Sequence, residues 1–428
     1  MRGDARADAC PGVLRLHDAA DGRLARVRLP GGRLHADALA ALARAAALGN
    51  DIVELTSRAG LQLRGLHADD ERALVALLGE GGLLPSRSHE RVRNILAPPL
   101  AGRDPAALAP LDALVAQIDR ALCADAALAE LPGRFLFAVE DGVGALRSVR
   151  ADVELRARRE APAAPAAGSR TGSRAGVFCL HLDGLATSGL VAAAGAHDAA
   201  LDAARAFLAL RRELAPGAWH VRELPGGGAR LARELGLTTP APADGAAGAH
   251  DPHARARVAL AERHRRLGLH VQRDGRLAVC AMPPLARLDG AQLLRLSQLA
   301  SAHAADVRVS PWRTLAFVDL TARAAPRLAR ELEDVGLAVR DGSGWDGLSA
   351  CAGLGACARA RTDVRTLARA RAAERDASSP SEHWSACERR CGEPSDVVVS
   401  HVAAADGTIV VGRPHAPAPA PTRTGAPA

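Results

Sequence analysis

Four cysteines near the C-terminal end have the type and spacing that most directly indicate chemistry. Five residues separate Cys351 from Cys357, and, thirty residues further on, three residues separate Cys387 from Cys391. Four thiolates can enclose an iron–sulfur cluster or a zinc ion, and zinc sites usually space their paired cysteines by two to four residues. We therefore expect a [4Fe-4S] cluster, with a zinc site or four unrelated buried cysteines as the alternatives.

The neighbours of these cysteines suit a cluster. Gly353 and Gly355 allow the backbone to bend closely around a bulky group. Arg389, Arg390 and nearby main-chain N–H groups could offset its negative charge. The other four cysteines are widely separated, and we interpret them as small buried apolar residues. They are Cys10, Cys123, Cys179 and Cys280.

The elements that must position these residues include a repeat. The pentapeptide Asp-Gly-Arg-Leu-Ala at 21–25 recurs unchanged at 274–278. After each copy we expect a strand, a turn, a helix with leucines on one face, and two more strands. Asp37 is expected to cap the first helix and Asp289 the second. The predicted strands are 26–29, 52–55 and 61–63 in the first copy and 279–282, 307–309 and 315–318 in the second. The chain therefore contains two similar α+β units, with Arg58 and Arg313 at nearly equivalent places.

Between and after the repeats, other segments follow helix and strand patterns. We expect a helix at 111–122, a strand at 177–182 and a helix at 201–214. Segments rich in Pro, Ala and Gly indicate loops or linkers at 160–175 and 237–252, and the tail from Arg413 is expected to be disordered.

Composition excludes several classes of function. The net charge is +7, but the arginines are scattered and only 2% of residues are aromatic, which argues against nucleic acid and favours an anionic small ligand. No run of 18 apolar residues is present, so we expect no membrane span, and no secretory signal is evident. We expect a cytoplasmic protein with reduced thiols. The glycines at 226–228 lack the lysine of a phosphate loop.

The cysteine spacing resembles the cluster motif of the sulfite and nitrite reductase superfamily, and the resemblance continues outside it. Residues 56–62, Thr-Ser-Arg-Ala-Gly-Leu-Gln, resemble the family's Thr-x-Arg-x-x-x-Gln segment. Arg-Asn-Ile at 93–95 and Leu-Pro-Gly-Arg-Phe at 131–135 resemble two further family segments. Within the superfamily the chain resembles the compact precorrin-3B synthase subgroup through Cys-Pro-Gly at 10–12, Ser-Pro-Trp-Arg at 310–313 and the run ending at Cys387.

The resemblance implies a fold and a set of domains. The fold is α+β, with two ferredoxin-like half-domains related by pseudo-twofold symmetry and two reductase-like α/β domains, of which the C-terminal one carries the cluster. We expect the half-domains to pair with their sheets joined. The expected domains are a first half-domain at 10–78, an α/β domain without cluster cysteines at 86–235, a second half-domain at 255–340, the cluster domain at 345–412 and the tail at 413–428.

The resemblance also implies an activity. It is the O2- and NADH-dependent hydroxylation of precorrin-3A at C20 with γ-lactone formation, a step of aerobic cobalamin synthesis. The implied cofactors are the [4Fe-4S] cluster on Cys351, Cys357, Cys387 and Cys391 and a mononuclear non-haem iron. NADH would deliver electrons through a partner reductase or ferredoxin. No spacing selects iron ligands among the available histidines, which are His17, His67, His89, His383 and His401.

Arginines that match family motifs are the expected contacts for the carboxylates of a tetrapyrrole, because arginine binds carboxylates in a bidentate manner. Trp312 is expected to stack near the ring or, more simply, to belong to the core. The candidate substrate-binding residues are Arg58, Gln62, Arg64, Arg93, Arg134 and Arg313.

The chain departs from the family pattern at four positions. Arg134 replaces a lysine and keeps the charge, whereas Leu136 replaces a second basic residue of sulfite reductases. Ala386 stands where a glycine is frequent, and Glu388 adds a negative charge beside the cluster. The loss of a cation at Leu136 argues against the alternative function, a sirohaem-dependent sulfite or nitrite reductase.

Overall fold

The computed structural model describes residues 10–159, 176–239, 264–394 and 396–412, and the chain divides into two compact units after Asp341. The predicted linker at 160–175, most of the predicted loop at 237–252 and the predicted disordered tail lie outside the described residues. Because the placement of the two units relative to one another is not determined, each is described by itself.

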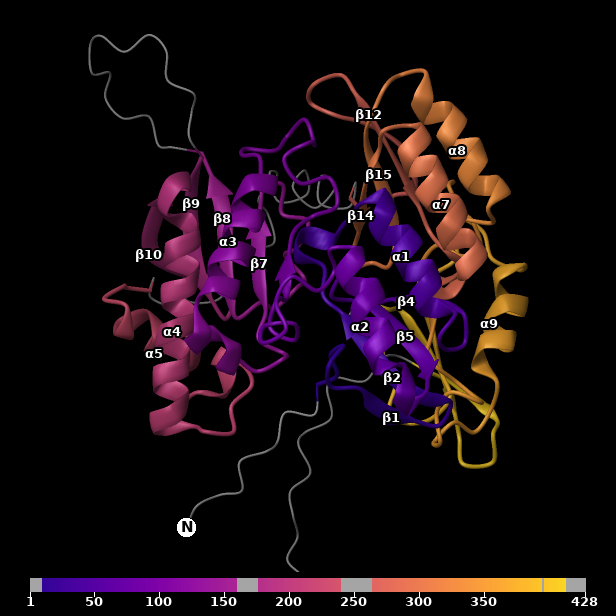
Figure 1. Cartoon of the computed structure of the whole chain (residues 1–428), viewed down its shortest axis with the longest axis horizontal. Helices are drawn as coiled ribbons and strands as arrows, with labels where there is room; N and C mark the ends of the chain where they lie inside the picture. The colour runs from indigo at the N-terminus through magenta and orange to yellow at the C-terminus, as the bar shows by residue number, and fades with distance from the viewer. Residues whose placement is uncertain (1–9, 160–175, 240–263, 395, 413–428) are drawn as a thin grey trace, which may run out of the picture. The chain divides into compact units, whose positions relative to one another are not determined.

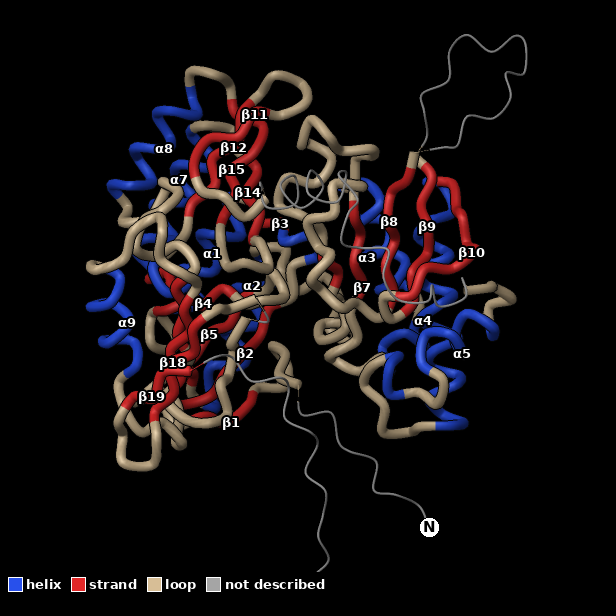
Figure 2. Tube along the Cα trace, turned by 180° about the vertical axis from the view of Figure 1, so that it is seen from behind, coloured by secondary structure: helices blue, strands red, loops and turns tan. Residues whose placement is uncertain are grey.

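The first unit contains two five-stranded antiparallel sheets, one for each repeat (Figures 1 and 2). The first sheet has the order β1 (His17–Ala19), β2 (Gly22–Val27), β5 (Leu61–Leu66), β4 (Ile52–Leu55) and β13 (Arg287–Asp289). The second has the order β11 (Gly268–Val271), β12 (Leu277–Ala281), β15 (Leu315–Leu320), β14 (Asp306–Val309) and β3 (Arg33–Leu34).

Each sheet is completed by a short strand from the other repeat. β13 of the second repeat pairs with β4, and β3 of the first repeat pairs with β14. We expected the two sheets to be joined, and this was wrong: they are separate sheets that exchange edge strands reciprocally. Gly32 allows the chain to enter β3, since its φ is +69° and a Cβ there would lie 2.0 Å from the Val309 carbonyl oxygen.

The helices of the two repeats share one core. α1 (Ala36–Ala46) and α7 (Gly290–Ala302) pack against each other, and the Ser297 hydroxyl donates to the Ala36 carbonyl at 2.8 Å. Leucines of both helices are buried in the same cluster as the inward-facing residues of the two sheets. The remaining helices of these repeats are α2 (Glu71–Glu80) and α8 (Ala324–Asp334).

The helix caps follow the sequence only in part. Asp289 caps α7 as predicted, since its side chain accepts from the Gln292 N–H and Gln292 returns a bond to the Asp289 N–H. The prediction for α1 was wrong, because His35 occupies the N-cap position without a capping bond and Asp37 lies in the first turn. Asp37 there still interacts favourably with the helix dipole.

The middle of the chain forms a third sheet in the first unit. Its order is β10 (Leu185–Ala192), β9 (Val177–Leu182), β8 (Val153–Arg158), β7 (Phe137–Glu140) and β6 (Ile95–Leu96), and β6, β7 and β8 are parallel. In Figure 2 β7 to β10 stand side by side, with α3 (Asp112–Ala124) and α4 (Ala196–Leu214) packed on the sheet together with α5 (Gly227–Glu234). The predicted helices at 111–122 and 201–214 and the strand at 177–182 are confirmed.

The second unit is built on one four-stranded sheet. Its order is β16 (Leu348–Ala350), β17 (Glu382–Ser385), β18 (Val399–Ala403) and β19 (Ile409–Gly412), and α9 (Val364–Ala372) contacts β16 and β17. The first three strands are parallel and β19 is antiparallel. β6, β7, β8 and β9 in the middle sheet follow the same order with the same directions.

Candidate functional site

In the second unit, the four cysteines follow the carboxyl ends of two neighbouring parallel strands. Cys351 comes directly after β16, and Cys387 lies two residues beyond β17. The two strands are in register from Leu348 and Glu382 to Ala350 and Trp384. Because the carboxyl ends of parallel strands meet at one edge of a sheet, both cysteine loops emerge at the same edge.

The two loops bend back on themselves so that each brings its own cysteines together. Gly353 and Gly355 adopt φ values of +73° and +83°, and the Cys357 N–H donates to the Gly353 carbonyl at 3.1 Å. In the second loop the Arg390 N–H donates to the Cys387 carbonyl at 3.3 Å, with Arg390 itself at φ +48°. The glycines therefore serve the bend that their position in the sequence indicated.

The thiols of Cys351, Cys387 and Cys357 act electrostatically on the thiol of Cys391. Burial raises the pKa of the Cys391 thiol, and the charges of Cys351, Cys387 and Cys357 raise it further. Burial also raises the pKa of Cys351, although the Ala386 N–H donates to its sulfur at 3.2 Å and lowers it. A cationic group bound between the loops would favour the ionised form of the Cys351 and Cys391 thiols.

Buried donors near the cysteines lack partners in a way that fits a sulfide-rich cluster. Among the described residues, neither the Ser385 hydroxyl nor the Trp384 indole N–H has a hydrogen-bond partner, and Ser385 is fully buried. Trp384 and Ser385 are consecutive residues of β17, so their side chains lie on opposite faces of the sheet. A [4Fe-4S] cluster held by the four cysteines would offer an acceptor to the donor on its own face of the sheet and would supply one-electron transfer.

A mononuclear iron finds no comparable support. No three His, Cys, Asp or Glu side chains among the described residues, the four cysteines included, form a group that could hold a single metal ion. Two of the histidines named from the sequence are held by other partners: His89 contacts Ser86, Ser88 and the Asp125 carbonyl, and His401 contacts Glu382. The described residues therefore do not fit a mononuclear iron, and we derive no step through one.

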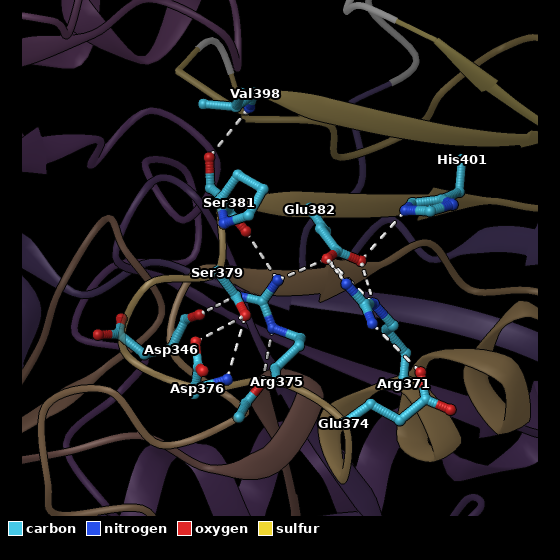
Figure 3. A network of polar contacts seen from close by, with 12 residues as sticks. Asp346, Arg371, Glu374, Arg375, Asp376, Ser379, Ser381, Glu382, Val398 and His401 are labelled. Atoms are coloured by element: carbon cyan, nitrogen blue, oxygen red, sulfur yellow. Dashed lines mark hydrogen bonds and ion pairs between the residues drawn. The ribbon is translucent and has the colours of Figure 1, made fainter.

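A charged network surrounds the buried Glu382 of β17 (Figure 3). Glu382, 1% exposed, accepts from Arg371 at 2.9 Å, contacts Arg375 at 2.8 Å and accepts from His401 at 3.1 Å. Arg375 also donates to the carbonyls of Gly344, Pro380 and Asp346. Burial would raise the pKa of Glu382, but hydrogen bonds and charge from the two arginines outweigh it and hold the pKa below its usual value.

His401 extends this network to an aromatic residue next to the cluster loop. Its ring stacks on Trp384 with the centroids 4.0 Å apart and the planes 5° from parallel. Glu388, whose charge we expected beside the cluster, pairs with Arg361 at 2.8 Å. Much of the negative charge that Glu388 brings is therefore offset within the same loop region.

In the first unit, arginines gather around the turn that carries Arg58. The Arg58 guanidinium donates to the Arg134 carbonyl at 2.9 Å, and the Arg134 guanidinium lies 4.5 Å from the centre of the Trp219 ring. Burial lowers the pKa of Arg58, with Arg134 and Arg26 lowering it further and Cys10 opposing them. We call Arg26, Arg28, Arg58 and Arg134 the cationic cluster.

Arg28 is the most buried member of the cationic cluster. Its guanidinium donates to the Arg91 and Pro11 carbonyls at 3.3 and 3.5 Å and to the Cys10 sulfur at 3.7 Å. Among the described residues no carboxylate lies within ion-pair distance of it. Burial therefore lowers the pKa of Arg28 to about 10. A cation buried with so little compensation favours an anionic ligand.

Three other predicted substrate-binding residues form hydrogen bonds or ion pairs with groups of the protein itself. Arg64 forms a bidentate pair with Asp21 at 2.9 Å, and Arg93 forms one with Asp119 at 2.7 Å. Gln62 accepts from Arg26 at 3.4 Å and donates to Glu54 at 2.9 Å. The structure therefore brings Arg58, Arg134 and Gln62 to the cationic cluster, whereas Arg64 and Arg93 are neutralised by aspartates.

The expected near equivalence of Arg58 and Arg313 holds to within one residue. The Ala59 N–H donates to the Thr56 carbonyl at 3.1 Å, and the Arg313 N–H donates to the Ser310 carbonyl at 3.0 Å. Ala59 and Arg313 share the positive φ, at +51° and +64°. The counterpart of Arg58 is therefore Trp312, which packs half-buried against the core, with the Arg265 guanidinium 5.1 Å from its ring centre.

Several residues near the cationic cluster were not predicted. Asp152, fully buried, accepts from the Leu136 and Val221 N–H groups at 2.9 and 2.8 Å and contacts His220 at 3.0 Å. Arg26 lies on β2 and alternates with buried Val27, whereas Arg28 follows the end of the strand and is itself buried, so the alternation could not place it. Cys10 is buried as expected, but it contacts Arg28 and so belongs to the site.

Comparison with known protein families agrees with the two repeats that form the first two sheets. The family model for the nitrite/sulfite reductase ferredoxin-like half domain matches residues 17–81 and 270–335, the two repeats. A precorrin-3B synthase from Sinorhizobium sp is 32% identical over 154 residues, 36% of this chain and 33% of that protein. A ferredoxin–nitrite reductase from Synechococcus elongatus is 34% identical over 126 residues, 28% of this chain and 25% of that protein. These matches span a third or less of either relative.

A solved structure is similar over most of the chain. The Mycobacterium tuberculosis NirA protein superposes with a TM-score of 0.67 and 17% identity, covering 91% of this chain and 73% of that one. At this identity the likeness concerns the fold. No helix among the described residues is long and apolar enough to cross a membrane.

Proposed function

We propose that this chain, which belongs to the superfamily carrying the nitrite/sulfite reductase ferredoxin-like half domain, is an iron–sulfur oxidoreductase that acts on an anionic tetrapyrrole. The observation that carries the proposal is the cationic cluster. In it, Arg28 is buried, Arg58 is half-buried, and neither forms an ion pair among the described residues, although Glu90 acts electrostatically on Arg28 and Asp152 on Arg58. A half-exposed turn lies next to them, where a ligand could reach Arg58 and Arg134. A macrocycle with carboxylates on its rim supplies the missing charge.

The reaction we propose is that of precorrin-3B synthase. One atom of O2 is added at C20 of precorrin-3A, the other leaves as water, and an acetate side chain closes a γ-lactone. The two electrons come from NADH through a partner reductase or ferredoxin. The partial match to a precorrin-3B synthase supports this choice, and so does Leu136, which is buried where a sulfite-reducing enzyme needs a second cation.

The roles of individual residues follow from their surroundings. Arg58 and Arg134 would bind substrate carboxylates, and Trp219 would keep the Arg134 guanidinium in place. Gln62, held by Arg26 and Glu54, offers a fixed polar contact. Arg64 and Arg93 would have to break their ion pairs with aspartates before they could bind a substrate carboxylate. We therefore propose that they support the site and do not contact the substrate. Arg313 remains a predicted contact.

The proposal is tested by incubating anaerobically purified protein with precorrin-3A, NADH, a reductase and isotopically labelled O2. We expect a product that carries one labelled oxygen atom. Arg58→Ala should lower tetrapyrrole affinity by about ten- to a hundredfold, since one charge-assisted contact is worth roughly 1.5–3 kcal/mol. Arg72→Ala, an exposed arginine of α2, is the matched control and should bind normally.

A sirohaem-dependent nitrite or sulfite reductase is the second candidate, favoured by the partial match to a ferredoxin–nitrite reductase. The absorption spectrum separates the two functions. Bound sirohaem gives strong Soret and red bands, whereas a cluster alone gives a broad shoulder. Sirohaem bands together with reduction of nitrite or sulfite, and no labelled product, would replace the first proposal by the second.

A further inference from the structure

A cleft of about 220 Å³ in the first unit is lined by charged residues that the proposed function does not use as a set. It lies where β3 and β14 meet the first turns of α1 and α3. Four arginines and two aspartates line it: Arg28, Arg33, Arg93, Arg308, Asp112 and Asp119. Its volume is below the roughly 300–1,000 Å³ of pockets that hold drug-sized ligands, so it suits a small ion or a single functional group.

Arg308 is the central residue of this cleft. It lies on β14, is 4% exposed, and one of its terminal nitrogens contacts Asp112 and Asp306 at 2.9 Å each. Its Nε has no hydrogen-bond partner among the described residues. Burial lowers the pKa of Arg308 even though the two aspartates raise it. A buried guanidinium N–H without an acceptor is costly, and an acceptor in the cleft would remove that cost.

The strand pairing places a second arginine beside the first. Arg33 of β3 stands directly opposite Arg308 in the ladder, and like charges in that position are destabilising. Asp306 contacts both, at 3.1 Å from Arg33 and 2.9 Å from Arg308, so one carboxylate serves two guanidinium groups. Asp112 is the second carboxylate at Arg308, but it is shared with Arg103, so neither carboxylate belongs to this arginine pair alone.

The charge balance of the whole cleft also leaves a cation in excess. Arg93 is neutralised by Asp119, and Asp112 is shared between Arg308 and Arg103, which has its own partner in Asp319. With Asp306 included, four lining arginines face three carboxylates. The excess cation is Arg28, which has carbonyl and sulfur acceptors but no described carboxylate within ion-pair distance.

We infer that this cleft binds one small oxyanion, a phosphate or a carboxylate group, between Arg308, Arg33 and Arg28. The anion would accept from the Arg308 Nε–H, relieve the repulsion across the β3–β14 ladder and neutralise Arg28. Because β3 is the strand that the first repeat lends to the second, the bound anion would also strengthen the junction between the repeats. The inference goes beyond the proposed function; it shares Arg28 with the cationic cluster, but it does not depend on the iron–sulfur cluster or on a bound tetrapyrrole.

The test is isothermal titration calorimetry of the full chain in a buffer free of phosphate and carboxylates. Inorganic phosphate is titrated in one arm and malonate in the other, which distinguishes the two sources of the oxyanion. We expect saturable binding of at least one of them at about one per chain. Arg33→Gln and Arg308→Met should each weaken it by about ten- to a hundredfold, as expected for the loss of one charge-assisted contact.

The controls separate the site from general charge effects. Arg33 is partly exposed, with 43% of its side chain accessible, so Arg33→Gln keeps the test valid if Arg308→Met fails to fold. Arg327→Gln removes an exposed arginine on α8, whose side chain is 71% accessible, and should leave the affinity unchanged. The inference is overturned if neither anion binds saturably, or if Arg33→Gln binds as tightly as Arg327→Gln.

Discussion

Replacing Glu382 by Gln should lower the free energy of unfolding of the second unit, although the side chain keeps its shape. The change removes the negative charge that faces Arg375, whose side chain is 1% exposed, and Arg371, whose side chain is 33% exposed. Removing one partner of a buried ion pair costs about 3–5 kcal/mol. Arg375 retains three carbonyl acceptors and Arg371 can reach water, so we expect a loss near the lower end, about 3 kcal/mol.

The measurement is urea unfolding of the full chain with Trp219 and Trp312 changed to Phe, so that fluorescence reports only Trp345 and Trp384 of the second unit. With a urea slope of about 1–3 kcal/mol/M, a loss of about 3 kcal/mol should lower the midpoint by about 1–3 M. Glu374→Gln is the matched control, because Glu374 contacts the same Arg371 but its side chain is 70% exposed, and it should cost less than about 1 kcal/mol. Equal effects of the two variants would refute the reasoning.

The same variant carries a pH prediction. The pKa of Glu382 in the folded protein lies below its usual value, so its contribution to stability is present above the unfolded pKa of about 4.3. That contribution is lost as the pH falls through the lower, folded pKa. The wild-type unit should therefore lose stability steeply in acid, and Glu382→Gln should show a flatter acid limb. An unchanged slope would mean that other carboxylates dominate the acid transition.

Two further substitutions test the strand exchange and the cluster environment. Leu288 lies on the exchanged strand β13 and is 1% exposed, so Leu288→Ala should lower the free energy of unfolding of the first unit by about 2–5 kcal/mol in urea. Leu294→Ala, at a 47% exposed position on α7, is the control and should change that free energy little. Comparable losses in the two variants would show that β13 does not stabilise the first sheet. Ser385→Ala should keep the iron and sulfide content but lower the reduction potential in an electron paramagnetic resonance titration, because the hydroxyl would otherwise donate to the cluster; an unchanged potential would place the hydroxyl away from it.

The repeats could be predicted from the sequence because their signals are local. Alternating residues at 52–55 and 307–309 and the Asp289 capping box each determine structure within a few residues, and the matching strands and helix followed. The exchanged strands could not be predicted. β3 and β13 have two and three residues, too few for a periodic pattern, and their partners lie more than 200 residues away in the sequence.

The same contrast between local and long-range signals applies to the candidate site. The cysteine spacing predicts the cluster ligands, and the loops that carry them are short and begin at neighbouring strands. The ligand set itself stays a prediction. The cationic cluster needed the structure, since Arg28 and Cys10 come together only through the fold of the first 30 residues around the middle sheet. In an arginine-rich chain no local pattern distinguishes the buried Arg28 from the aspartate-paired Arg64.

The central claim is that Cys351, Cys357, Cys387 and Cys391 hold a [4Fe-4S] cluster, and the most direct test is iron, zinc and acid-labile sulfide analysis of anaerobically purified protein. The account predicts about four irons and four sulfides per chain in the wild type and the loss of both in Cys357→Ser. Cys123→Ser, a half-buried thiol away from the motif, should retain them. A colourless protein with one zinc per chain and no sulfide, or a Cys357→Ser variant with full cluster content, would contradict the account.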